Sequence, residues 1–298
     1  MSTSRPEPSP ASRRLARWRN LLIGVLLSAF FLWIALRDLD WAGVGAVLRE
    51  AQWGFVPLTM VIWSLGLAAR ALRWRVMLGG GPAFAPTFHI LNIGFTVNNT
   101  LPFRIGELAR AYLIGRGERG VSVWSALSTI VAERIIDMLT VVVLLGAVLP
   151  VLPVDQAAVT GGLALGAVAV VGFAVLLIFA HRPDWAHALL GLALRFAPFA
   201  RRLNPASLLD RVLDGLQPLT TRRGLLGTGL WTALAWACSV AGAWSLARVF
   251  PELPQTPVMQ AGLTLAIVAA SFSIIIPFTL ASVGPFEAAT IFALTTAG

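Results

Sequence analysis

Long apolar runs separated by short polar segments make up most of this chain. A transmembrane α-helix needs about 20 consecutive apolar residues, and most of these runs come close to that length. Arginine residues stand at the ends of many of the runs. We therefore predict about six transmembrane helices, at residues 20–36, 54–69, 121–149, 159–180, 225–247 and 258–276.

The composition is that of a membrane protein. Of the 298 residues, 57% are hydrophobic and 12% are charged, and the mean hydropathy is +0.78. A soluble domain of this size cannot bury so large an apolar fraction. The predicted fold class is therefore all-α, a polytopic integral membrane protein with two further broken or re-entrant segments. Residues 20–298 are expected to form one transmembrane domain, because no polar segment is long enough to hold a soluble enzyme domain.

The arginine residues indicate how the chain lies in the membrane. The formal net charge is +9, and the chain contains no lysine, a usage that fits a GC-rich bacterial genome. Arginines at the ends of apolar runs favour contact with anionic lipid headgroups over contact with nucleic acid. Residues 1–19, rich in Pro, Ser and Arg, are expected to be a disordered basic tail, and the next arginine cluster is Arg70, Arg73 and Arg75. The positive-inside rule then places the N-terminus in the cytoplasm, with the chain in a bacterial inner membrane.

A cleaved signal peptide over residues 1–36 is the competing interpretation of the first apolar run. No small-x-small cleavage site follows this run, and Arg37 and Asp38 come directly after it. We favour an uncleaved first transmembrane helix.

The largest polar segment is predicted to lie on the cytoplasmic side. Residues 181–224 contain seven arginines and three aspartates. Within them, "WAHALLGLALRFAPFARRL" is amphipathic and has basic residues at its end, a pattern typical of a helix that lies on a membrane surface.

Residues 88–103 are apolar but have arginines on both sides. Arg75 precedes them, and Arg104 and Arg110 follow. A spanning helix would place one of these flanks outside the cell, so we predict a re-entrant hairpin that enters from the cytoplasmic side. Irregular backbone at membrane depth is tolerated only where protein or a wet cavity surrounds it, so the hairpin implies a cavity.

The stretch "NNTLPFRIGELARAY", residues 98–112, is unusually polar for this chain. Pro102 and Gly106 interrupt helical hydrogen bonding, and a helix is expected to restart near Ile105. The backbone amides of the restarted helix would then point back towards the break.

Side chains around this break suit an anionic group. Asn98, Asn99 and Arg104 supply hydrogen-bond donors beside a helix N-terminus, a combination that can hold a lipid phosphate. Glu107 and Arg110 are three residues apart and share a face of the restarted helix. The alternative is that these two residues pair with each other and that the asparagines only cap the break.

A second charged group lies in "AERIIDML". Glu133 and Asp137 are four residues apart on one helix face, and Arg134 is placed to pair with Asp137. Charges within a membrane helix are costly, so they are expected to face the interior of the bundle. The trio has a net charge of −1, and Arg104 or Arg110 is the expected partner of the remaining carboxylate. The alternative role is a structural salt bridge that holds two helices together.

A second break is expected near the C-terminus, in "IIIPFTLASVGPFEAAT". Pro277, Gly284 and Pro285 interrupt this apolar run, and Glu287 follows. The stretches "LPFRIGE" and "IPFTLASVGPFE" share the order Pro, Phe, Gly, Glu. Paired broken segments in two halves of a chain indicate a midplane binding site, so an inverted repeat is a hypothesis here. The spacing differs between the two stretches, and chance similarity is the alternative.

No pattern of catalytic or metal-binding residues emerges. His89, His181 and His187 are not spaced as metal ligands, and no nucleophile–base set accompanies them. The single cysteine, Cys238, lies in an apolar run. We predict no catalytic residue, no metal and no cofactor, and we do not expect an enzyme.

The two charged stretches resemble the core of the lysylphosphatidylglycerol synthase transmembrane, or flippase-like, family. That family has an Asn, Pro, Arg, Gly-Glu, Arg pattern, then a basic loop and Glu-Arg-x-x-Asp in the next helix. The matching positions here are Asn99, Pro102, Arg104, Gly106, Glu107, Arg110, Glu133, Arg134 and Asp137. The resemblance covers roughly residues 20 to 298.

Two departures from the family limit what the resemblance implies. The soluble aminoacyl-transferase domain of some members is absent, so lysyl transfer is not implied. The late family motif resembles Thr-Pro-Gly-Gly-x-Gly-x-x-Glu, but this chain reads "TLASVGPFE". Thr279, Gly284 and Glu287 remain, and the turn-forming Pro-Gly-Gly is lost.

The expected function is the binding and translocation of an anionic or aminoacylated phospholipid, or of a lipid-linked intermediate, across the membrane. Arg104 and Arg110 would hold the headgroup phosphate, while Glu107, Glu133, Asp137 and Glu287 would line the cavity. Arg134 would keep the carboxylates in place. Membrane lipids and a lipid-modifying enzyme are the expected partners, and nucleic acid is not. The alternatives are a non-transporting membrane partner of a glycolipid or polyprenyl-phosphate enzyme, and a proton-coupled small-solute transporter.

Overall fold

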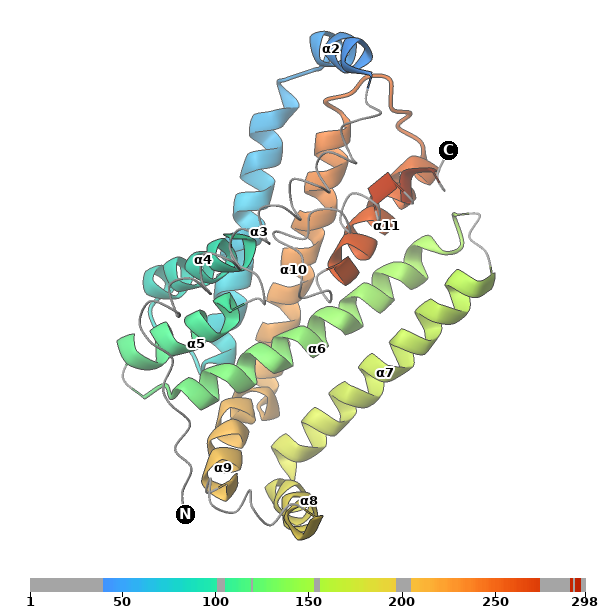
Figure 1. The fold of residues 1–298 in the computed structure, drawn as a ribbon. Coiled ribbons are helices and arrows are strands. Elements are labelled where there is room, and N and C mark those ends of the chain that lie inside the picture. The colour runs from blue at the N-terminus through green and yellow to red at the C-terminus, as the bar shows by residue number, and fades with distance from the viewer. Residues whose placement is uncertain are drawn as a thin grey trace, which may run out of the picture.

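The computed structural model describes residues 40–100, 105–118, 120–152, 156–196, 205–273, 290–291 and 293–295. Every element bounded within these ranges is a helix (Figure 1). The elements are α2 (Trp41–Glu50), α3 (Phe55–Met77), α4 (Phe84–Thr100), α5 (Gly106–Gly117), α6 (Val123–Val148), α7 (Gln156–His181), α8 (Pro183–Phe196), α9 (Pro205–Leu216), η3 (Gln217–Thr220), α10 (Arg222–Ala247) and α11 (Pro257–Ser273).

The long helices α3 and α10 pack along each other and form one side of the bundle (Figure 1). Small residues allow the close approach. A Cβ atom built on Gly66 would lie 3.1 Å from the Cβ of Cys238, and Gly242 faces the indole of Trp63. Helices that approach through glycine gain van der Waals contact along their backbones, which is the usual way in which helices associate in lipid.

Among the described residues, α3 and α10 are long and apolar enough to cross a bilayer individually. A third span results if Gly166–His181 and Pro183–Arg195, which meet at 106°, are counted as one bent span. The charged residues of "AERIIDML" lie on α6, which has 26 residues. The predicted helix at 20–36 lies outside the described residues. Helices occur at the other five predicted positions, but six spans remain a prediction.

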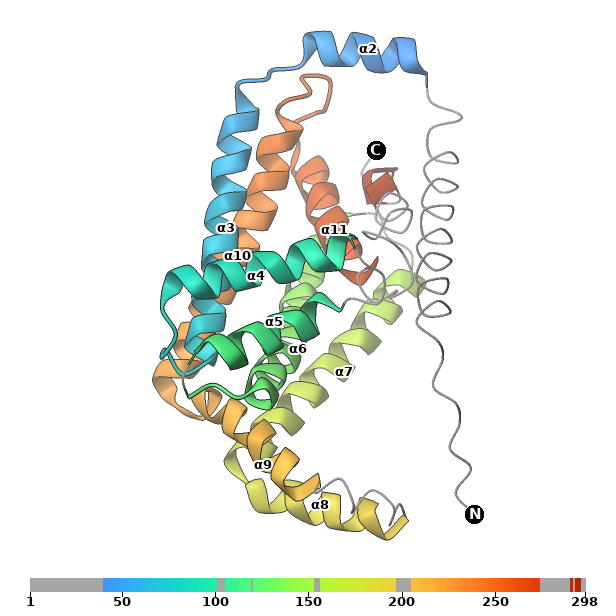
Figure 2. The same ribbon diagram turned by 60° about the vertical axis from the view of Figure 1, so that its left-hand side comes forward.

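We call the pair α4 and α5 the hairpin. Residues 88–100 of the segment predicted to be re-entrant all lie in the single helix α4, and its entry from the cytoplasmic side stays a prediction. Figure 2 shows α4 and α5 side by side, steeply inclined to α3 and α10. The helix that was expected to restart near Ile105 begins at Gly106. Gly94 of α4 and Gly106 of α5 lie in direct contact, since a Cβ atom on Gly106 would overlap the carbonyl oxygen of Gly94. The two helices therefore cross at a point that has no room for a side chain.

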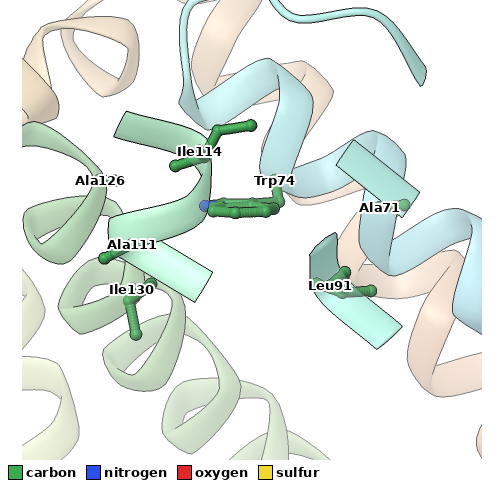
Figure 3. Close-up of a cluster of buried hydrophobic side chains, with 7 residues drawn as sticks. All are labelled: Ala71, Trp74, Leu91, Ala111, Ile114, Ala126 and Ile130. Carbon is green, nitrogen blue, oxygen red and sulfur yellow. The ribbon is translucent and has the colours of Figure 1, made fainter. Parts of the chain in front are cut away.

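A compact apolar cluster joins this hairpin to the rest of the bundle. Trp74 of α3 is fully buried at its centre, between residues of α4, α5 and α6 (Figure 3). The buried members of the cluster are Ala71, Trp74, Leu91, Ala111, Ile114, Ala126 and Ile130. Burial of a large aromatic ring stabilises this junction and fixes α5 relative to α3 and α6.

The polar segment 181–224 differs in part from the single surface helix that we predicted. Its described part contains α8, α9 and the short helix η3, and α8 lies at a steep angle to α7. Helix α9 packs onto α6, where Gly215 lies against Ser125 and Ser128. Sequence amphipathicity did not reveal this packing, because an apolar stripe suits a neighbouring helix as well as a lipid surface.

At the opposite end, α2 lies across the ends of α3 and α10 (Figures 1 and 2). The carboxylate of Asp40 caps it by accepting a hydrogen bond from the backbone N–H of Ala42 at 3.0 Å. None of its residues is buried, and Trp41 is 63% exposed. An exposed amphipathic helix with a tryptophan, set across the ends of two apolar helices, is typical of the membrane–water interface.

Candidate functional site

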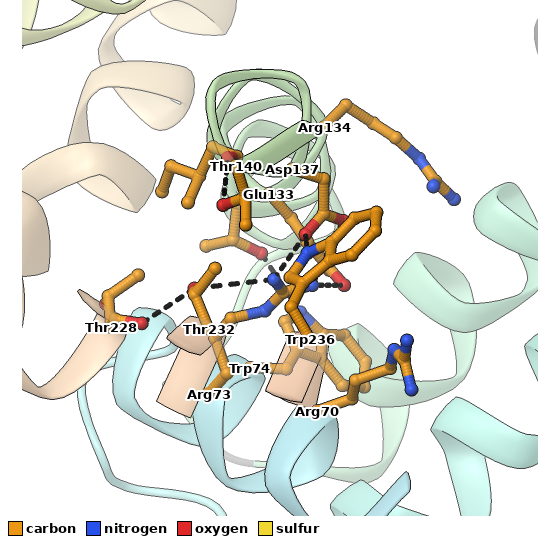
Figure 4. Close-up of polar contacts among 12 residues, drawn as sticks. Arg70, Arg73, Trp74, Glu133, Arg134, Asp137, Thr140, Thr228, Thr232 and Trp236 are labelled. Atoms are coloured by element: carbon orange, nitrogen blue, oxygen red, sulfur yellow. Dashed lines mark hydrogen bonds and ion pairs between the residues drawn. The ribbon is translucent and has the colours of Figure 1, made fainter. Parts of the chain in front are cut away.

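Arg73 of α3 lies in the interior of the bundle and binds two carboxylates of α6 (Figure 4). Its Nη2 lies 2.6 Å from Oε1 of Glu133, and its Nη1 lies 2.6 Å from Oδ1 of Asp137. A further hydrogen bond of 3.2 Å joins Nη2 to Oδ2 of Asp137. Glu133 and Asp137 are one helical turn apart, so one planar guanidinium can reach both.

Glu133 is also bound by a second arginine from the hairpin. Arg110 of α5 donates to Oε2 of Glu133, and both side chains are almost completely buried. The guanidinium of Arg110 lies over the ring of Trp74, 4.1 Å from its centroid. The indole N–H of Trp74 in turn donates to the hydroxyl of Thr129 at 3.1 Å. Glu133 therefore bridges α3 and α5, and Trp74 supports one of its two partners.

Arg134 points away from this buried group and towards the hairpin (Figure 4). Its Nε donates to Oε1 of Glu107 at 3.0 Å, and its Nη2 donates to the same oxygen. The Arg134 and Glu107 side chains are 35% and 26% exposed. This second contact between α5 and α6 is accordingly more open than the one at Glu133.

Helix α10 completes the surroundings of Asp137. The indole N–H of Trp236 donates to Oδ1 of Asp137 at 3.1 Å, and the hydroxyl of Thr232 accepts from Nη1 of Arg73 at 3.4 Å. Within the described residues, the Nε atoms of Arg73 and Arg110 are buried and have no hydrogen-bond partner. Four helices thus meet at these charges, and two buried donors are left over.

Arg70 adds a further positive charge one turn before Arg73. Its Nη2 donates to the hydroxyl of Ser239 at 2.9 Å. In the part of the chain that the structure describes, Arg70 forms no ion pair. We call the whole group the charge cluster: Arg70, Arg73, Glu107, Arg110, Glu133, Arg134 and Asp137. Its four arginines and three carboxylates have a net charge of +1.

The structure brings together five of the residues that the sequence singled out. Arg110 binds the remaining carboxylate, as expected, but the expected pair of Arg134 with Asp137 and the alternative pair of Glu107 with Arg110 do not form. Arg134 binds Glu107 rather than Asp137, and Asp137 binds Arg73. Glu107 and Arg110 do not pair with each other, because each reaches a different residue of α6. In both cases a residue on a neighbouring helix is a better partner than one on the same helix.

The asparagines before the break have different surroundings. Oδ1 of Asn98 accepts a hydrogen bond from the backbone N–H of Gly106 at 2.8 Å, so Asn98 caps the restarted helix from across the hairpin. Asn99 is exposed. The other predicted site and break residues lie outside the described ranges, and their roles remain predictions: Pro102, Arg104, Pro277, Gly284, Pro285 and Glu287.

Sequence reasoning missed Arg70 and Arg73. It ended the second apolar run at residue 69 and treated the following arginines as a cytoplasmic flank. The helix instead continues to Met77, and Arg73 is 1% exposed. The available signal was that the apolar residues continue through "ALRWRVML".

A search of the described residues finds no group of three or more His, Cys, Asp and Glu side chains that is placed to hold a metal ion. The chemistry of the cluster is that of arginine with carboxylate. An arginine of such a group can bind a phosphate in place of its carboxylate. A carboxylate of the group can likewise bind an ammonium group in place of its arginine.

The conserved pattern of a known family matches almost the whole chain. The pattern described as the lysylphosphatidylglycerol synthase TM region matches residues 21–298. The chain belongs to this family. The charge cluster lies on helices within the matched range, so it is part of the family's membrane region.

Curated relatives are similar over shorter stretches. Glycosyltransferase AglD of Haloferax volcanii is 29% identical over 153 residues, which is 50% of this chain and 24% of that protein. A UPF0104 membrane protein of Pyrococcus horikoshii is 26% identical over 137 residues, 43% of this chain and 39% of that protein. Another UPF0104 membrane protein, of Methanothermobacter thermautotrophicus, is 29% identical over 102 residues, 33% of this chain and 30% of that protein. The matches thus span less than half of each of these relatives, and no solved structure matches the chain.

Proposed function

We propose that this protein binds the anionic headgroup of a phospholipid, or of a lipid-linked intermediate, inside the helical bundle and moves it between the two leaflets of the membrane. The observation that carries this proposal is the excess positive charge of the charge cluster. The protein would act in the cytoplasmic membrane of a bacterium, with its N-terminus in the cytoplasm.

A charge within a membrane protein is costly unless an opposite charge accompanies it. Three of the four arginines in the cluster have carboxylate partners, and Arg70 has only the hydroxyl of Ser239 among the described residues. A lipid phosphate would supply the remaining negative charge. Arginine is suited to this role because its planar fork can bind two phosphate oxygens at once.

The location of the cluster favours movement over simple retention. It lies where the α4–α5 hairpin meets α3, α6 and α10 (Figures 2 and 4). A headgroup that crosses a bilayer needs polar partners at membrane depth, since hydrocarbon offers none. Exchange of Arg110 between Glu133 and a lipid phosphate would provide such a partner midway. An aminoacylated headgroup would also find Glu107 and Glu133 as partners for its ammonium group.

Reconstitution in liposomes tests the proposal. Fluorescent anionic, zwitterionic and aminoacylated lipids would be followed by dithionite quenching, which removes the signal from the outer leaflet. We expect selective exchange of the anionic or the aminoacylated lipid. The Arg104→Ala and Glu133→Ala variants should abolish it. Wild-type liposomes that behave like empty ones with every lipid would contradict the proposal.

Arg70→Gln is the most informative variant, because it breaks no described ion pair and should fold. Loss of one charge-assisted hydrogen bond to phosphate, worth about 1.5–3 kcal/mol, should slow exchange roughly tenfold or more. Arg49→Gln on the exposed helix α2 is the matched control and should leave the rate unchanged. Equal rates in the two variants would refute the role of Arg70.

Glu287 is the competing source of negative charge, and it lies outside the described residues. If it neutralised Arg70, the effects of Arg70→Gln and Glu287→Gln on the free energy of unfolding would be strongly non-additive. Additive effects, together with slower exchange in Arg70→Gln, would support a lipid phosphate as the partner.

A second candidate function is that of a non-transporting membrane partner of a glycolipid or polyprenyl-phosphate enzyme. The observation in its favour is the similarity to a protein named glycosyltransferase AglD, of which the match covers only 24%. On this proposal, liposomes would show no exchange, while addition of the protein would raise the activity of the enzyme. The proton-coupled transporter is less favoured, because Glu133 and Asp137 both have arginine partners.

A further inference from the structure

A large cavity lies at the end of the bundle opposite α2. Its volume is about 1040 Å³. The C-terminal end of α3, the N-terminal ends of α6 and α10, and the helices α9 and η3 surround it. Figure 1 shows these segments gathered at the lower end of the molecule. None of the residues of the charge cluster lines it, so it is a separate site.

The charged side chains that line the cavity are mainly basic. They are Arg75, Arg211, Arg223 and Asp214, with a net charge of +2. The Nε of Arg75 donates to the carbonyl oxygen of Pro82 at 2.7 Å, which fixes the direction of this side chain. Arg211 and Arg223 are exposed and form no ion pair with a described residue. Three guanidinium groups from three different helices therefore face one space with only one carboxylate.

The backbone around the cavity adds to this positive character. The helices α6 and α10 both begin here, after their capping residues Ser122 and Thr221. Helix N-termini carry partial positive charge and unpaired N–H groups. Gly79, Gly80 and Gly120, which also line the cavity, have φ values of 80°, 75° and 87°. Because these residues have no side chain, a ligand can approach the main chain closely.

We propose that this cavity binds a phosphate or diphosphate group. Several arginines together with two helix N-termini form the combination of charge and donors that phosphate oxygens prefer. The volume exceeds what a single phosphate needs, so the group would belong to a larger molecule. The cavity lies at the ends of α3 and α10, the two apolar helices, and therefore at the boundary between membrane and water. A lipid headgroup and a water-soluble phosphate ester would both have access.

This inference does not depend on lipid translocation. A protein that assists an enzyme, rather than moving lipid, would use the same cavity for a phosphate-bearing substrate. Binding of inorganic pyrophosphate in the cavity should consequently not depend on the charge cluster, none of whose residues lines the cavity.

The test measures phosphate binding to the purified full-length protein. Inorganic pyrophosphate would be titrated into detergent-solubilised protein. In a second arm, the stability of the protein would be compared in nanodiscs with and without phosphatidic acid, a lipid that carries a phosphate. The Arg211→Gln/Arg223→Gln variant should bind roughly tenfold more weakly or worse, because it loses two charge-assisted hydrogen bonds. The matched control is Arg182→Gln/Arg195→Gln, which removes the same charge at exposed positions that do not line the cavity.

The outcomes separate the two sources of phosphate. Pyrophosphate binding that only the cavity variant loses supports the proposal with a soluble ligand. If phosphatidic acid stabilises the protein and pyrophosphate does not bind, and only the cavity variant loses this stabilisation, the proposal is supported with a lipid ligand. Absence of binding in both arms, or equal loss in the cavity variant and its control, would overturn it.

Discussion

Arg73 and Glu133 are 60 positions apart in the chain, and their side chains meet at 2.6 Å in the interior of the bundle. Glu133 holds a second arginine, Arg110, on its other oxygen. One carboxylate thus joins a long apolar helix, α3, to the hairpin that crosses it. The contact holds these helices together, and in the proposed function it is the place where a charged lipid would exchange with Glu133.

Removal of Arg73 should destabilise the protein strongly. Arg73→Ala leaves Asp137 without its cationic partner and Glu133 with only Arg110, and breaking a buried ion pair costs about 3–5 kcal/mol. Chemical unfolding in detergent would measure the loss. Arg49→Ala on the exposed helix α2 should stay within about 0.5 kcal/mol of the wild type. A loss below about 1 kcal/mol for Arg73→Ala would contradict the geometry.

The crossing of α4 and α5 should not tolerate a methyl group. In Gly106→Ala, the new Cβ would overlap the carbonyl oxygen of Gly94 and the side chain of Asn98. Overpacking of this kind costs about 1–3 kcal/mol. Gly117→Ala is a control at the other end of α5, where a Cβ atom meets nothing within 4 Å. The melting temperature should fall for Gly106→Ala only, and an equal fall in both would show that the crossing is not tight.

The two contacts between α5 and α6 should differ in strength. Double-mutant cycles with alanine would measure the coupling energy of each pair. The partly exposed pair Arg134–Glu107 should give roughly 0.5–1 kcal/mol, since solvent screens it. The buried pair Arg110–Glu133 should give about 2–3 kcal/mol. Similar couplings in the two cycles would mean that burial does not distinguish them.

The cap provided by Asn98 should depend on its oxygen. Asn98→Ala removes the acceptor of the Gly106 N–H and should cost about 1 kcal/mol of unfolding free energy. Asn98→Asp keeps an acceptor at the same position and should recover most of this loss. If the aspartate variant were as unstable as the alanine variant, the hydrogen bond across the hairpin would not be the cause.

Much of the helical framework could be predicted from the sequence, because hydropathy sums over many residues and tolerates local error. The helix predicted at 121–149 spans Val123–Val148, and the one predicted at 225–247 spans Arg222–Ala247. Arginines on both flanks of residues 88–103 predicted a re-entrant hairpin, but residues 88–100 form one helix, α4, which pairs with α5. The restart of a helix near Ile105 was predicted correctly, since α5 begins at Gly106.

The partners within the site could not be predicted in the same way. Local spacing favoured a pair between Arg134 and Asp137, but the bundle offers Glu107 and Arg73 instead. Which of several nearby charges meet depends on how the helices cross, and that depends on contacts such as Gly94 with Gly106. Arg73 was assigned to a flank because the positive-inside rule describes average positions and does not identify an arginine held by carboxylates.

The close contact between Gly94 and Gly106 also has a mechanical consequence. It joins α4 and α5 into one stiff body, to which Arg110 and Asn98 belong. The chain enters this body after Gly79 and Gly80 and leaves it near Gly120, and all three have backbone angles that favour glycine. The hairpin is therefore one rigid unit whose connections to α3 and α6 both contain glycines with positive φ. A ligand that took Arg110 from Glu133 would remove one contact between this body and α6, while the Trp74 cluster and the Arg134–Glu107 pair would still hold the body in place.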